Sequence, residues 1–277
     1  MRLRVIVGVF LISLVACSEE TPDLGAGIAE SAISSRTTPT STSSTVRKFS
    51  EPTTSTAFGP LQVLVLHKTA GFRHDSIPAG IAAITELGEE HGYIVTATGD
   101  ASVFTRSGLA DYDVIVFLST TGDILNGDQE HAMERFIRAG NGFVGIHSAT
   151  DTEYEWPWFK GLVGAYFDSH PAPQTATVSI LESEHWTMQG LPTSFVRFDE
   201  WYNFRSLPGP GVMIIATLDE NSYQGGNMGE SHPIVWAQEY DGGRSWYTAL
   251  GHTVESFSEP LVLTHLVNGI LWAAQSG

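Results

Sequence analysis

Short apolar runs without polar alternation recur along the chain after residue 59. Leu61–Leu66, Ile94–Thr98 and Asp113–Leu118 are three of them, and Gly142–Ile146 is a fourth. Runs of this kind are typical of strands that are buried on both faces of a parallel sheet. We therefore predict that these segments form a largely parallel central sheet.

Amphipathic segments separate these runs. Residues 76–92 and 126–140 carry apolar side chains at helical spacing, with Ser76 and Asn126 as expected N-cap residues and a glycine near each C-terminal end. Strands and helices that alternate with short connections are the signature of an α/β, doubly wound, mostly parallel sheet of the flavodoxin-like kind.

The pattern becomes β-rich after residue 170. Asp241–Arg244 reads as a hairpin turn because Asp-Gly favours tight turns. Residues 156–167 look like a short helix, and residues 259–274 like a final amphipathic helix. The expected strands of this portion are residues 174–181, 195–204, 212–218, 234–240 and 245–250.

The first residues predict export and lipid attachment. Arg2 and Arg4 precede the apolar run Val5–Ala16, which is too short to span a membrane and ends at Cys17. This arrangement resembles a bacterial lipobox and implies cleavage after residue 16 and a lipid on Cys17, although an ordinary signal peptide with an incidental cysteine is the alternative. Ser18 at the next position favours the outer membrane, facing the periplasm, by resemblance to Gram-negative lipoproteins.

Composition divides the rest into a tether and one domain. Residues 17–58 are rich in Ser, Thr and Pro and have few large apolar side chains, so we expect a disordered, lipid-anchored tether. Residues 59–277 show no internal linker or repeat and are expected to form a single domain. The membrane is thus expected as a partner only through the N-terminal lipid.

Charge and cysteine content exclude some functions. The net charge of −17 disfavours binding to a phosphate backbone, so no nucleic acid partner is expected, while neutral or cationic ligands and metal ions are favoured. The chain has one cysteine, Cys17, which leaves no thiol for chemistry in the folded part.

The apolar run Gly142–Ile146 ends abruptly in polar side chains. Ligands of open α/β sheets bind beyond the carboxyl ends of the strands, which makes His147, Ser148 and Asp151 candidate site residues. Gly145–Ala149 has the outline of a nucleophile elbow, but a histidine, His147, stands where a cysteine or serine belongs.

Several short polar motifs follow the expected strands and turns. They are Thr69–Ser76, Gly145–Thr152, Ser169–Pro171, Asp199–Tyr202, His232–Trp236 and Ala249–Thr253. Together these motifs closely resemble the trehalose-utilisation (ThuA-like) family, over roughly residues 61–274. The resemblance implies a class I glutamine amidotransferase-like fold and a role in carbohydrate metabolism. Amidotransferase activity is excluded because the elbow cysteine is missing.

Histidines and carboxylates of these motifs are the candidate reactive groups. We expect His147 and His74 to act as acid/base or ligand groups, with Asp199 or Glu200 as the carboxylate partner. His147, His170 and His252 could instead hold a divalent metal, zinc or manganese, or all of these histidines could be hydrogen-bonded structural residues. Candidate ligand-binding residues are Thr69, Arg73, Ser148, Asp151, Trp156, Trp158, Trp201, Tyr202 and His232.

Two functions remain open from the sequence. The first is a membrane-tethered extracytoplasmic enzyme that acts on a sugar or keto-sugar derivative by acid/base chemistry, with or without a metal. The second is a non-catalytic carbohydrate-binding lipoprotein. Both require a small carbohydrate ligand.

Overall fold

The computed structural model describes residues 59–275. The predicted signal peptide, the lipidated Cys17 and the tether to residue 58 lie outside the described residues. Within the part that is described, no helix is both long and apolar enough to cross a membrane.

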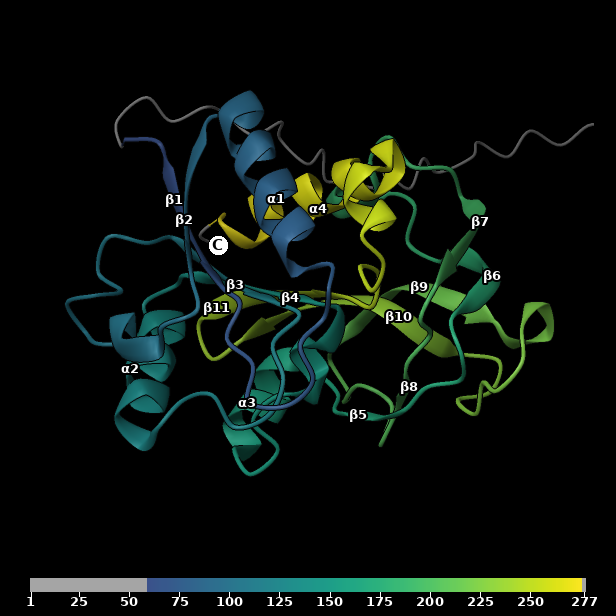
Figure 1. Ribbon diagram of the computed structural model, residues 1–277, viewed down its shortest axis with the longest axis horizontal. Helices are drawn as coiled ribbons and strands as arrows, with labels where there is room; N and C mark the ends of the chain where they lie inside the picture. Colours follow the sequence, from purple (N-terminus) through teal and green to yellow (C-terminus); the bar gives the residue numbers. More distant parts are fainter. Residues whose placement is uncertain (1–58, 276–277) are drawn as a thin grey trace, which may run out of the picture. The chain divides into compact units, whose positions relative to one another are not determined.

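A mixed nine-stranded sheet runs through the domain in the order β2-β1-β3-β4-β11-β10-β9-β6-β7 (Figure 1). Its first five strands are parallel. They form one half of the sheet, and β1, β3, β4 and β11 are almost fully buried, as the uninterrupted apolar runs predict. The same prediction is wrong for β2, which lies at the edge of the sheet and is mostly exposed. These strands are β1 (Leu61–Leu66), β2 (Tyr93–Thr98), β3 (Val114–Leu118), β4 (Gly142–Ile146) and β11 (Gly243–Thr248).

The other half of the sheet is antiparallel. Its link to the parallel half is the β10–β11 hairpin, where Asp241 and Gly242 both have positive φ, 49° and 98°, as a tight Asp-Gly turn requires. The strands are β10 (His232–Tyr240), β9 (Met213–Asp219), β6 (Gln174–Ile180) and β7 (Ser194–Asp199), and a separate pair consists of β5 (Phe167–Ser169) and β8 (Asn203–Phe204).

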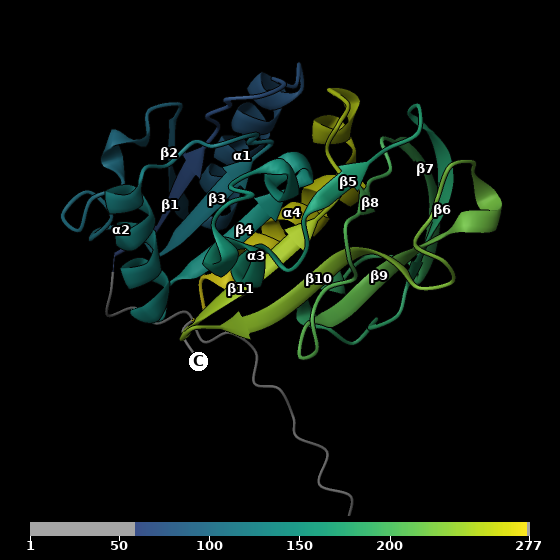
Figure 2. The same ribbon diagram turned by 90° about the horizontal axis from the view of Figure 1, so that it is seen from below.

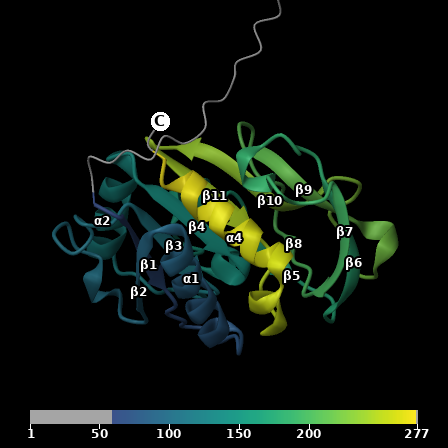
Figure 3. The same ribbon diagram turned by 90° about the horizontal axis from the view of Figure 1, so that it is seen from above.

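Helices cover both faces of the parallel half. Helices α1 (Ile77–His91) and α4 (Pro260–Ala273) lie together on one face, and α2 (Gly127–Arg138) and α3 (Pro157–Val163) lie on the other (Figures 2 and 3). Close contact between α4 and β11 depends on Gly269, because a Cβ atom there would lie 2.4 Å from the ring of Trp246. The predicted doubly wound α/β fold is confirmed.

Three local predictions need correction. Ser76 precedes α1, but its hydroxyl does not cap the helix and donates instead to the carbonyl of Gly251, at 3.0 Å. The helix expected over residues 156–167 begins at Pro157 and ends before Gly164, whose φ is 95°. The strand expected over residues 195–204 ends at Asp199, because its partner strand β6 begins there at Gln174, and Asn203–Phe204 pair with β5 in the separate sheet.

One buried carboxyl gives the fold a pH dependence. Glu153 is 3% exposed and accepts hydrogen bonds from the backbone N–H groups of Ile124 and Leu125. Burial nevertheless raises the pKa of Glu153 to about 7. The folded state therefore binds this proton more tightly than the unfolded chain, and stability falls as pH rises from about 4.3, the ordinary pKa of Glu, through 7.

We expect Glu153→Gln to weaken this pH dependence. The glutamine carbonyl can accept the same two backbone hydrogen bonds and carries no charge, so at pH 8 the variant should be more stable than the wild type by roughly 2–4 kcal/mol. At pH 4 the two proteins should differ little. Urea unfolding at pH 4, 6 and 8 measures the difference, and a wild-type-minus-variant stability that stays constant across this range would refute the assignment.

Candidate functional site

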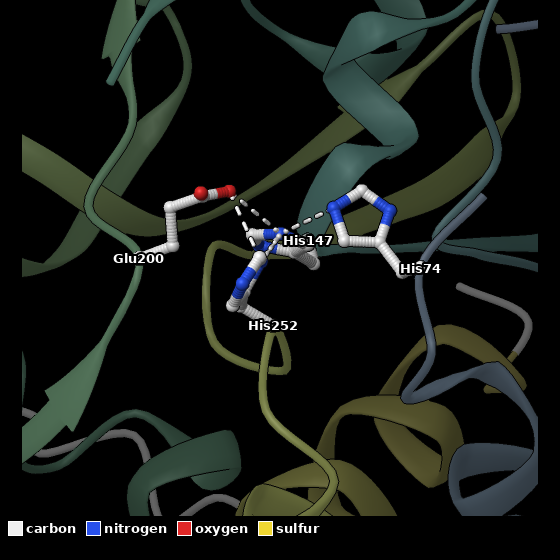
Figure 4. A group of neighbouring side chains, drawn as sticks. All are labelled: His74, His147, Glu200 and His252. Carbon is white, nitrogen blue, oxygen red and sulfur yellow. Dashed lines mark hydrogen bonds and ion pairs between the residues drawn. The ribbon is translucent and has the colours of Figure 1, made fainter. Parts of the chain in front are cut away.

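Four ionisable side chains converge beyond the carboxyl ends of the parallel strands (Figure 4). His74 lies in the loop after β1, His147 directly follows β4, and His252 lies in the loop after β11. Glu200 directly follows β7. One ligand atom from each residue lies within 4.8 Å of every other, and we call these four residues the His–Glu centre.

His147 stands on a strained elbow. Its φ is 51°, in the left-handed region that residues other than glycine rarely adopt, and a short 3₁₀ helix, His147–Asp151, follows it. Small residues two positions away on either side make room for the turn, since a Cβ atom on Gly145 would lie 3.2 Å from Cβ of Ala149. The Tyr247 hydroxyl donates to the His147 carbonyl at 2.8 Å and holds the turn in place.

A hydrogen bond between Nδ1 and the Ala249 carbonyl sets the tautomer of the His147 ring. Nδ1 lies 3.0 Å from the carbonyl oxygen of Ala249, which can only accept, so Nδ1 carries a proton. Nε2 is then the nitrogen that can offer a lone pair as a ligand, and it faces the interior of the centre. It lies 3.1 Å from His74 Nε2, 3.3 Å from His252 Nδ1 and 3.5 Å from Glu200 Oε2.

The remaining members are also fixed by neighbours. His74 Nδ1 lies 3.3 Å from the Ser148 hydroxyl, and His252 Nδ1 lies 3.1 Å from Glu200 Oε2. The second oxygen of Glu200 contacts His170 Nδ1 at 3.0 Å. Neighbouring donors in a tetrahedral zinc site are about 3.3–3.4 Å apart, as bond lengths of about 2.0–2.1 Å require. The distances from His147 Nε2 to the other three members, and from His252 to Glu200, are 3.1–3.5 Å and suit a metal ion.

Burial and mutual contact set the charges of the centre. Burial, with smaller contributions from His147 and His252, lowers the pKa of His74 to about 3. Burial raises the pKa of the Glu200 carboxyl, but hydrogen bonds and charge from His147 and His252 outweigh burial and hold that pKa well below its usual range. Burial lowers the pKa of His252, while Glu200 outweighs burial and leaves that pKa above its ordinary value.

Asp199, the other predicted carboxylate, supports the centre from outside. It is fully buried and accepts the backbone N–H groups of Gly251 and His252, both at 3.1 Å. Asp199 forms an ion pair with Arg197, at 3.1 Å. Arg197 also donates a hydrogen bond to the Ser256 hydroxyl, at 2.7 Å. Asp199 thus positions the His252 loop and does not face the other members of the centre.

Other predicted residues adjoin the centre. The Tyr202 ring packs against the His147 ring with centroids 4.5 Å apart, and Ser148 contacts His74. His170 lies outside the His–Glu centre, which His74 joins in its place, and contacts it through Glu200. Asp151 is half-buried and accepts a hydrogen bond from the Tyr154 hydroxyl, while burial raises the pKa of Asp151.

The β1–α1 loop carries two further predicted residues. Thr69 forms a parallel bridge with Thr121, and Arg73 donates to the carbonyl of His67 at 3.1 Å. Both contacts shape the loop that presents His74.

Four predicted ligand-binding residues are buried or hydrogen-bonded away from the His–Glu centre. Trp201 is fully buried and donates to the Gln174 carbonyl, so it offers no ring face to a ligand. Trp156 and Trp158 stack on each other, and Trp158 donates to Asp241 in the β10–β11 turn, at the opposite end of the parallel strands. These three rings therefore cannot form the predicted stacking platform.

His232 is the fourth. It is fully buried, and its ring nitrogens contact the Glu220 carboxylate at 2.8 Å, the Tyr223 hydroxyl at 2.9 Å and the Tyr202 carbonyl at 2.8 Å. Its role in the fold is to fix the backbone next to Tyr202.

Phe72 adjoins the centre although sequence reasoning did not select it. Its ring packs edge to face against His74, with centroids 4.9 Å apart, and the residue is 67% exposed. It lies within the motif Thr69–Ser76, but an aromatic residue in a loop carries no signal of exposure in the sequence.

Comparison with known proteins identifies relatives. The family model described as trehalose utilisation, ThuA, matches residues 62–273. A ThuA-like protein of Bacteroides uniformis is 24% identical over 81% of this chain and 95% of its own, with a TM-score of 0.68. A ThuA-like protein of Parabacteroides merdae is 19% identical over 78% of this chain and 90% of its own, with a TM-score of 0.65. At these identities the two structures show a shared fold. A comparison with curated protein sequences finds no match.

Proposed function

This chain belongs to the ThuA, or trehalose-utilisation, family, and we propose on that basis that it is an enzyme acting on a sugar or keto-sugar derivative at the His–Glu centre. We further propose that the centre binds one divalent metal ion, zinc or manganese. The convergence of three imidazole nitrogens and one carboxylate oxygen at the carboxyl edge of the parallel strands is the observation that carries this proposal.

The donor set favours zinc. Imidazole nitrogens suit zinc, whereas manganese prefers carboxylate and water oxygens. His147 is prepared as a ligand because Ala249 holds its Nδ1–H and leaves Nε2 free, the arrangement that orients most metal-binding histidines. Ser148 and His170 contact His74 and Glu200 from outside in the same way.

The chemistry follows from the groups present. A metal bound here would polarise a substrate carbonyl and lower the pKa of a bound water. Enolisation or elimination at a keto-sugar needs such polarisation together with proton transfer, and it needs no covalent nucleophile. The elbow carries His147 where hydrolytic relatives of this fold carry cysteine, so amidotransferase chemistry is not part of the proposal.

We place the protein in the cell envelope, held by a lipid on Cys17 and facing the periplasm. Support comes from the basic start of the chain, the apolar run that follows it and the single cysteine at the expected cleavage point. A small carbohydrate is the proposed partner, and nucleic acid is not, because the chain carries a net charge of −17.

Removal and restoration of the metal tests the enzyme. Full-length protein, treated with a chelator and then reloaded with zinc or manganese, is incubated with trehalose and its keto derivatives, and products are followed by mass spectrometry. We expect conversion only after reloading, with at least a hundredfold loss in the chelated protein. Sugar binding without conversion under every metal condition would identify a carbohydrate-binding lipoprotein instead. The absence of both sugar binding and conversion would overturn the proposal.

A further inference from the structure

Phe72 presents an exposed aromatic ring on a fixed loop. The residue is 67% exposed, which is unusual for so large an apolar side chain. Its carbonyl accepts the Thr121 hydroxyl at 2.8 Å, and the backbone N–H of Gly71 lies 3.2 Å from the same hydroxyl oxygen. Arg73 on the other side is tied to the His67 carbonyl. The ring is therefore presented from a backbone that is held on both sides.

The ring stands directly against the His–Glu centre. The His74 ring packs at nearly right angles against Phe72, His147 and His252, with centroids 4.9, 4.7 and 5.3 Å away. Phe72 extends this row of rings outward from the buried centre. The His252 side chain is 24% exposed, so the centre is not closed off from solvent.

A pyranose matches these surroundings. One face of such a sugar gathers axial C–H groups that pack on an aromatic ring, while its oxygens remain free for polar partners. Trp201 and Tyr202, which follow Glu200 in the chain, are both buried and offer no comparable face. Phe72 supplies the apolar surface, and the histidines and Glu200 supply the polar partners.

We propose that Phe72 is the stacking platform of a pyranose subsite, which places a sugar oxygen at the His–Glu centre. This inference rests on the proposed function, because it names the ring that would hold the carbohydrate substrate. In this proposal Phe72 determines which sugar binds, and the four residues of the His–Glu centre bind the metal ion.

A shielding role for Phe72 gives a different expectation. If the ring only protects His74 from water, leucine should serve nearly as well, because it keeps an apolar cover. If the ring stacks on a sugar, leucine should fail and tyrosine or tryptophan should succeed, since they keep an aromatic face. The zinc affinity of each variant shows whether His74 can still bind the metal ion.

Saturation-transfer NMR with methyl β-D-glucopyranoside separates these cases. The full-length protein is measured with and without zinc, and the H1, H3 and H5 protons of the sugar should receive saturation. We expect Phe72→Leu to weaken sugar binding about 3- to 10-fold with unchanged zinc affinity, and Phe72→Tyr to bind as the wild type does. Phe198→Leu, at an aromatic residue on β7 that is 51% exposed, is the matched control and should change nothing.

The outcomes are distinct. Unchanged saturation in Phe72→Leu, or no saturation of the sugar in the wild type, would overturn the subsite. A loss of zinc affinity in Phe72→Leu would show that Phe72 shields His74 and would also overturn it. Saturation that depends on Phe72 in a protein without turnover would leave the subsite standing while the enzymatic proposal fails.

Discussion

Asp199→Ala should lower the free energy of unfolding by about 3–5 kcal/mol, the usual cost of removing one member of a buried ion pair. The Asp199 carboxylate is fully buried and pairs with Arg197, whose side chain is 4% exposed and would keep only the partly exposed Glu259 carboxylate, at 3.3 Å. The substitution also leaves the N–H groups of Gly251 and His252 without their acceptor. Urea denaturation at neutral pH measures the loss.

Two further variants define the cause. Asp199→Asn keeps an acceptor oxygen but removes the charge, and should cost less, about 1–3 kcal/mol. Arg138→Ala removes the partner of Asp241 at a site where the two side chains are 48% and 33% exposed, so the loss should be about 0–1 kcal/mol. A cost for Asp199→Ala no greater than that for Arg138→Ala would show that Asp199 does not hold the His252 loop.

His147→Asn should abolish metal binding and turnover while costing little stability. An asparagine amide can keep the hydrogen bond to the Ala249 carbonyl, and asparagine tolerates the left-handed φ of 51° better than most residues. It removes the Nε2 atom that faces the other three members of the His–Glu centre. We expect zinc affinity to fall at least a hundredfold and the unfolding free energy to change by less than about 1 kcal/mol.

Calorimetry and urea unfolding on the same preparation separate this role from a structural one. If His147 is only a hydrogen-bonded core residue, the substitution should cost about 1–3 kcal/mol and leave zinc binding as in the wild type. His91→Asn, at an exposed histidine that ends α1, is the matched control. Its zinc affinity, turnover and stability should all equal those of the wild type.

The sequence could place His147 because the rule is local. An apolar run that stops at a polar cluster ends a buried strand, and parallel strands bring their carboxyl ends to one edge. The same reasoning placed His74 after β1 and His252 after the last strand. The elbow geometry at His147 follows the spacing of Gly145 and Ala149, which can be read directly from the chain.

The sequence offered Glu200 only as an alternative to Asp199, because the position of Glu200 relative to the histidines depends on strand order. Four strands separate β4 from β7 in the sheet, yet Glu200 lies 3.5 Å from His147. Such a contact requires the sheet to coil so that β7 returns toward β4, and no pattern of apolar residues specifies coiling of this kind. Asp199 and Glu200 differ in role because successive side chains of a strand point to opposite faces, and the sequence does not show which of the two faces the histidines.

Of the four predicted aromatic residues, Tyr202 lies against the centre, whereas the three tryptophans are held elsewhere for a related reason. Proximity in the chain to a polar motif does not decide on which side of the sheet a ring lies. Trp158 follows the elbow motif, but Pro157 begins α3 there and carries the ring to Asp241, in the β10–β11 turn. Phe72 lies beside the centre because Thr121 holds its loop, a contact between residues far apart in sequence.

The metal centre can be tested most directly by X-ray absorption spectroscopy on full-length protein loaded with zinc. We expect one zinc per chain, bound by nitrogen and oxygen atoms at about 2.0–2.1 Å. The spectrum should carry the multiple-scattering signal of three imidazoles, and His147→Asn should lose that signal. A protein that takes up no stoichiometric zinc or manganese, or one whose zinc spectrum is the same in His147→Asn, would contradict this expectation.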